Sequence, residues 1–126
     1  MRASIALSPE LSGVAAVRHF AEAALIEWQV TGETYERSRL AIAELVTNVV
    51  RHAKIPGELV IDYSDHRVRV EVSDSSPGLP KLSEPAGDAV NGRGMLIVAS
   101  IVDRWGVDST ESGKIVWFEI DQFDND

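Results

Sequence analysis

A carboxylate and an amide lie four residues apart in a long apolar segment, at Glu44 and Asn48. Apolar residues recur there at helical spacing, so we expect one helix from about 34 to 53 with both side chains on one face. An amide oxygen can ligate magnesium, and a carboxylate can act as a base. The pair therefore predicts a site for a hard cation or a reacting water. The alternative is a stripe that faces water or caps a neighbouring turn.

A second candidate is the segment from Asp74 to Gly78, which directly follows an alternating strand expected at 68–72. A carboxylate at a strand end commonly caps the next turn, and a glycine commonly permits one. A buried carboxylate also accepts well from an exocyclic amine, and a glycine lets backbone approach a flat base. The segment is therefore compatible with an ordinary turn or with recognition of adenine.

The third candidate is Asn91-Gly92-Arg93-Gly94, directly before an apolar helix expected at 95–102. Glycines allow tight turns near a ligand, a helix start offers free amides, and arginine can bind phosphate with its guanidinium fork. The pattern is not a Walker loop, which requires G-x-x-x-x-G-K-[ST], nor a dinucleotide fingerprint, because Ile97 occupies the place of its third glycine. Alone it is a weak signal for phosphate.

The remaining elements follow from periodicity and turn residues. A first helix is expected from Ser8-Pro9-Glu10 to about Trp28, and from 73 to 94 the periodicity stops. Strands are expected at 2–7, 59–63, 68–72, 105–107 and 114–120. Short turns join neighbouring strands, so the fold class is α/β, a two-layer sandwich of a mixed, largely antiparallel sheet covered on one face by helices. We expect one domain over 1–126.

Composition excludes several classes of function. The sequence has no cysteine, so disulfides, thiol catalysis and cysteine-ligated metals are excluded. Its net charge of −8, from 20 acidic and 12 basic residues, disfavours direct binding of nucleic acid or an anionic membrane. No stretch approaches the length of a membrane span, and the first residues lack the apolar core of a signal peptide. The expected location is cytoplasmic.

Taken in this order and on these elements, the three segments resemble the nucleotide-binding motifs of the GHKL (histidine-kinase-like) ATPase superfamily. Residues 43–53 (AELVTNVVRHA) resemble its N box, 68–78 its first glycine box, and 92–95 (GRGM) its second. The likeness covers about 8 to 120. It extends to the anti-sigma-factor serine/threonine kinases and to stand-alone actinobacterial relatives, where a serine-proline pair also occurs in the first glycine box, here Ser76-Pro77.

The resemblance implies a Bergerat-type ATP-binding fold with ATP and Mg²⁺ as cofactors. It implies that Asn48 ligates the magnesium, that Glu44 orients or deprotonates the nucleophile, and that Asp74 accepts from the adenine amine, with Gly78 near the base. A lid at about 79–93 is expected to fold over the phosphates. The residues expected to cradle those phosphates are Gly92, Arg93 and Gly94.

The implied function is a protein serine/threonine kinase that phosphorylates a serine of an anti-anti-sigma (STAS-type) partner and sequesters a sigma factor. Relatives often pair through the first strand and helix, so a homodimer is a further expectation. Two departures favour an alternative, a non-catalytic regulatory binding switch with weak or no nucleotide binding. Ser76 replaces a glycine of the wider family, and Ile115 is the better match to a threonine that many relatives place near the adenine-binding aspartate.

Overall fold

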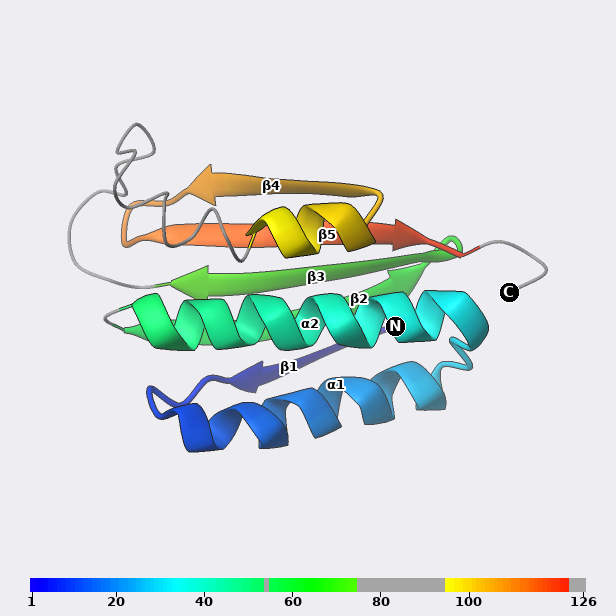
Figure 1. The fold of residues 1–126 in the computed structure, drawn as a ribbon, viewed down its shortest axis with the longest axis horizontal. Coiled ribbons are helices and arrows are strands. Elements are labelled where there is room, and N and C mark those ends of the chain that lie inside the picture. Colours follow the sequence, from blue (N-terminus) through cyan, green and yellow to red (C-terminus); the bar gives the residue numbers. More distant parts are fainter. Residues whose placement is uncertain (54, 75–94, 123–126) are drawn as a thin grey trace.

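The computed structural model describes residues 1–53, 55–74 and 95–122, which form a five-stranded sheet with helices on one of its faces (Figure 1). The strands are β1 (Arg2–Ala6), β2 (Pro56–Ser64), β3 (Arg67–Asp74), β4 (Arg104–Ser109) and β5 (Lys114–Asp121). The helices are the 3-10 turn η1 (Leu11–Gly13), α1 (Val14–Glu27) and α2 (Gly32–His52), and residues 95–101 are also helical. The two-layer prediction is confirmed.

The sheet order is β1-β2-β3-β5-β4, and each of these four pairings is antiparallel. Side chains alternate between the faces of a strand, so every second residue of β3 and β5 points toward the helices. Those residues are Val68, Val70 and Val72 in β3 and Val116, Phe118 and Ile120 in β5, and all of them are buried. Removing a large apolar side chain from water stabilises the fold by about 1.5–3 kcal/mol.

The long helix α2 lies across the middle of the sheet (Figure 1). Its apolar residues face the strands at the predicted spacing: Ala41, Ile42, Leu45, Val46, Val49 and Val50 are buried. The opposite positions are partly or fully exposed, which is the pattern of a helix packed on one side. The sequence pattern thus predicted α2 to within two residues of its observed start.

The first helix begins later than predicted. The Ser8 hydroxyl accepts a hydrogen bond from the Glu10 amide at 3.1 Å, which closes a local turn in place of a helix cap. The 3-10 turn follows, and α1 starts only at Val14. Gly13 fits this junction because a Cβ there would lie 2.9 Å from the Ser8 Cβ. The serine-proline-glutamate signal therefore marks the entry to the 3-10 turn.

Candidate functional site

The face of α2 that carries Glu44 and Asn48 is half-buried. Both side chains are partly exposed, and they alternate with the buried residues Leu45 and Val49 that face the sheet. The two polar groups therefore share one face at the border between the core and the surface, as their four-residue spacing predicts. Helix α2 supplies a carboxylate and an amide side by side on a rigid element.

Asp74 lies at the end of the sheet where α2 also ends. It is the last residue of β3, and its Cα partner in β2 is Pro56, four residues after the end of α2 at His52. Asp74 is 9% exposed, and among the described residues it is the only buried side chain that carries a carboxylate. Figure 1 shows β3 and α2 terminating at the same end of the molecule. Asp74 therefore lies at the same end of the molecule as the last turns of α2, which carry Asn48.

A bulge in β2 shapes the backbone beside Asp74. The ladder between β2 and β3 shifts register between Pro56 and Leu59. The Ser73 hydroxyl accepts from the Glu58 amide at 2.9 Å. A Cβ at Gly57 would overlap that hydroxyl and lie 3.0 Å from the Ser73 carbonyl oxygen. Gly57 and Ser73 therefore fix the strand end that presents Asp74, a supporting role that the sequence pattern did not indicate.

The residue beside Asp74 in the neighbouring strand is Lys114. The β3–β5 ladder pairs Asp74 with Lys114 and Ser73 with Ile115. Because side chains alternate along a strand, Ile115 points to the face of the sheet away from the helices. The expectation that Ile115 lies near the aspartate on the same face is therefore wrong, and the residue of β5 beside Asp74 is Lys114. The register between β3 and β5 shows which residue lies beside Asp74, and the sequence of β5 alone does not reveal that register.

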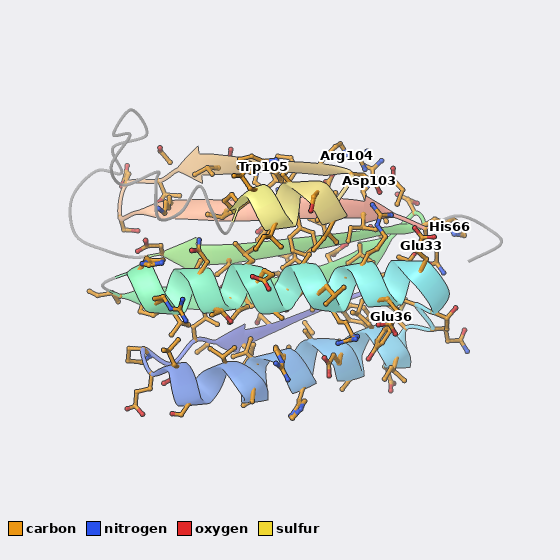
Figure 2. All side chains as sticks on the ribbon, in the orientation of Figure 1. Glu33, Glu36, His66, Asp103, Arg104 and Trp105 are labelled. Carbon is orange, nitrogen blue, oxygen red and sulfur yellow. The ribbon has the colours of Figure 1, made fainter. Side chains whose placement is uncertain are left out.

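Arg37 connects α2 to the segment that follows the helical residues 95–101. Its Nε donates to the Ile101 carbonyl at 2.8 Å, and its terminal nitrogen donates to the Asp103 carboxylate at 3.1 Å. Asp103 in turn accepts from the Asp121 amide at 2.7 Å. In Figure 2 Asp103 lies toward the end of the molecule where α2 begins, marked by Glu33. These bonds hold the helical segment between α2 and β5.

Comparison with known proteins identifies the family. Residues 7–120 match the family model described as "Histidine kinase-like ATPase domain". The chain belongs to this family. No curated protein matches the chain. One solved structure that matches is the histidine kinase domain of a blue-light activated histidine kinase from Erythrobacter litoralis EL346, at 18% identity and a TM-score of 0.49, covering 86% of this chain and 60% of that chain.

The described part of this ATPase-family domain fits the nucleotide and metal that the family implies. It holds no group of three or more His, Asp or Glu side chains that could bind a metal ion by itself. Magnesium in nucleotide sites usually takes one or two protein ligands together with substrate phosphates, and the Asn48 amide suits that role. The buried Asp74 carboxylate suits an exocyclic amine.

Several predicted site residues lie outside the described residues of this ATPase-family domain. They are Ser76, Gly78, Gly92, Arg93 and Gly94, together with the lid expected at about 79–93. Their roles remain predictions. The described helices include none that is long and apolar enough to cross a membrane.

Proposed function

We propose that this ATPase-family domain is an anti-sigma-factor-type serine/threonine kinase that binds Mg-ATP. The observation that carries the proposal is the arrangement of three polar side chains. Glu44 and Asn48 share one half-buried face of α2, and the buried Asp74 lies at the end of the sheet where that helix ends. A carboxylate, an amide and a second carboxylate at one end of the helix-covered sheet are the groups that a base and a metal-bound phosphate chain require.

Each described side chain then has a chemical task. Asp74 accepts a hydrogen bond from the base, and Asn48 holds magnesium through its amide oxygen. Bound Mg-ATP supplies the γ-phosphoryl group and the metal charge that neutralises it. Glu44 orients the serine hydroxyl of the protein substrate and takes its proton as the oxygen bonds to phosphorus, while ADP leaves. Positioning on α2 and charge neutralisation provide most of the catalysis.

The protein substrate and the sequestered regulator follow from the resemblance to anti-sigma kinases. We infer an anti-anti-sigma protein of the STAS type as the partner whose serine accepts the phosphoryl group, and a sigma factor as the second partner. The charge of the chain supports partners with a basic contact surface, because its net charge is −8 and complementary charge guides association. High salt is accordingly expected to slow association with either partner.

Calorimetric titration with ATP, with and without magnesium, tests the nucleotide site. We expect micromolar, magnesium-dependent binding that is lost in Asp74→Asn, because the neutral amide oxygen accepts more weakly than a carboxylate and the other half of the amide is a donor facing the amine of the base. Asp108→Asn is the matched control, since Asp108 is exposed on β4. No detectable binding at millimolar ATP would contradict the proposal and leave the non-catalytic binding switch as the better account.

Phosphoryl transfer is tested with γ-labelled ATP and an anti-anti-sigma protein that carries the acceptor serine. Glu44→Gln is expected to abolish labelling while ATP affinity stays within about twofold, because Glu44 acts on the hydroxyl rather than on the nucleotide. Glu36→Gln is the control on the same helix, because Glu36 is exposed and forms an ion pair with Arg39. Undiminished labelling in Glu44→Gln would remove Glu44 from the role of base.

A further inference from the structure

We propose that Lys114 is a second base-recognition residue, which donates a hydrogen bond to the ring nitrogen N1 of adenine while Asp74 accepts from the neighbouring exocyclic amine. The inference rests on the proposed ATP site and adds to it a residue that determines which base is bound. Both residues belong to the described part of the chain, on adjacent strands of one ladder. The proposal follows from their register, their face and their chemistry.

The register places the two residues directly opposite each other. Asp74 in β3 and Lys114 in β5 are Cα partners, and the next pair on the same face is Val72 with Val116. Both valines are buried beneath the helices, so Asp74 and Lys114 project from the helix-covered face at the end of the ladder. Residues directly opposite in an antiparallel pair have Cβ atoms about 4.5–5.5 Å apart. One flat base can therefore contact both side chains.

The chemistry of the pair is complementary to one edge of adenine. An ionised carboxylate only accepts hydrogen bonds, and a lysine ammonium only donates them. Adenine carries a donor, the exocyclic amine, next to an acceptor, N1. A carboxylate beside an ammonium matches this donor beside an acceptor in a single orientation of the base. Guanine has the opposite polarity at these two atoms, with an acceptor oxygen beside an N–H donor.

Within the part of the chain that the structure describes, no carboxylate pairs with the ammonium of Lys114. Lys114 is half-buried, so this ammonium lies at the border between the sheet and solvent, where a ligand can reach it. Surface arginines nearby in sequence behave differently, since Arg104 bonds Glu119 and Asp121. A lysine at this place can replace the hydroxyl donor that relatives carry as threonine, with a longer reach.

The test compares ATP with 1-deaza-ATP, in which a C–H group replaces N1. Calorimetric titrations use the wild-type chain and Lys114→Met, which keeps the stem and removes the donor. We expect the wild type to prefer ATP by roughly tenfold, the usual effect of one hydrogen bond to a charged group. Lys114→Met should bind both ligands equally, at the wild-type affinity for 1-deaza-ATP. Lys114→Arg should keep the preference, because it retains a charged donor.

Ile115→Thr is the matched control, because it adds a hydroxyl one residue away but on the opposite face of the sheet. It should bind both ligands as the wild type does. Equal wild-type affinity for ATP and 1-deaza-ATP overturns the proposal, as does tighter binding of GTP than of ATP. A preference that persists in Lys114→Met also overturns it. Failure of the wild type to bind ATP at all refutes the proposed function itself, so the two failures are distinguishable.

Discussion

Arg37 and Asp103 form an ion pair of 3.1 Å that joins α2 to the connection between the helical residues 95–101 and β4. The Arg37 side chain is partly buried and Asp103 is exposed, and the same arginine donates to the Ile101 carbonyl at 2.8 Å in a partly buried hydrogen bond. Arg37 lies seven residues before Glu44 on the same face of α2, about 10 Å along the helix axis. Arg37 thus links the face of α2 that carries Glu44, the candidate general base, to the helical residues 95–101.

Arg37→Met is expected to lower the free energy of unfolding by about 1–2 kcal/mol, because it removes two charge-assisted hydrogen bonds and leaves the partly buried Ile101 carbonyl without this donor. Urea unfolding followed by circular dichroism measures this change. Amide hydrogen exchange should rise in residues 95–101 more than in α2, since the tether acts on that segment. Arg39→Met is the control, because among the described residues Arg39 forms an ion pair with the exposed Glu36 alone, and its loss should leave the unfolding midpoint unchanged. Equal effects of the two substitutions would contradict a specific tether.

The end of α1 carries a residue in the left-handed backbone region. Gln29 has φ of 62°, and the amides of Gln29 and Val30 bond to the carbonyls of Ile26 and Leu25. This is the Schellman arrangement, in which glycine is favoured at the left-handed position, and the buried Val30 and Leu25 supply its apolar contact.

Gln29→Gly is therefore expected to raise the free energy of unfolding by about 1 kcal/mol, because glycine has no Cβ to strain in this conformation. Thermal unfolding of the two proteins measures the difference. The contrasting variant is Ala23→Gly in the exposed middle of α1, where glycine should cost about 1 kcal/mol. A loss of stability in both variants would show that the left-handed residue is not strained.

Two serines of the same fold differ in whether their hydroxyls have partners. Ser38 in α2 is fully buried, and its hydroxyl makes no hydrogen bond within the described part of the chain. Ser73 in β3 bonds the Glu58 amide at 2.9 Å. Ser38→Ala should stabilise the protein by about 1 kcal/mol, because an unsatisfied buried hydroxyl is removed from a helix. Ser73→Ala should destabilise it by a similar amount. Chemical denaturation of both variants tests the contrast, and a destabilised Ser38→Ala would reveal a partner for that hydroxyl.

Local patterns predicted much of this structure, and register and long-range pairing account for the rest. The helical spacing around Glu44 and Asn48 correctly predicted α2 and the shared face of its polar pair. Alternation along β3 and β5 likewise predicted two strands with one buried face each. Alternation within β5 alone could not say which of its faces meets Asp74, so Ile115 was matched where Lys114 lies.

Sequence patterns do not predict contacts between residues that are far apart in the sequence. Arg37 and Asp103 are separated by 66 residues, and an arginine on a helix is ordinarily a solvated group. Proline and glycine mark turns as well as bulges, so residue types alone do not distinguish the bulge that begins at Pro56 from a turn. Only the packed sheet shows that Ser73 completes that bulge beside Asp74.

The face of the sheet away from the helices carries a network of arginines and carboxylates that makes stability depend on pH. Arg104 donates to Glu119 and to Asp121 at 2.8 and 2.6 Å, and Arg69 donates to Glu119 at 2.8 Å. Burial opposes ionisation of Glu119, but the hydrogen bonds from Arg104 and Arg69 outweigh it and lower its pKa. The hydrogen bond from Arg104 lowers the pKa of Asp121 despite partial burial.

Both carboxyl groups therefore bind protons more weakly in the folded chain than in the unfolded chain, where their pKa values are 4.5 and 3.8. The stability that they contribute is complete above those values and is lost as the pH falls through the lower folded-state values. We expect the free energy of unfolding to be constant from pH 7 to about pH 5.5 and to decrease below pH 4.5. Urea unfolding at stepped pH measures the profile. Glu119→Gln should flatten the acid limb, whereas Glu111→Gln, in the exposed turn before β5, should leave it unchanged; equal acid limbs in all three proteins would exclude the network as its source.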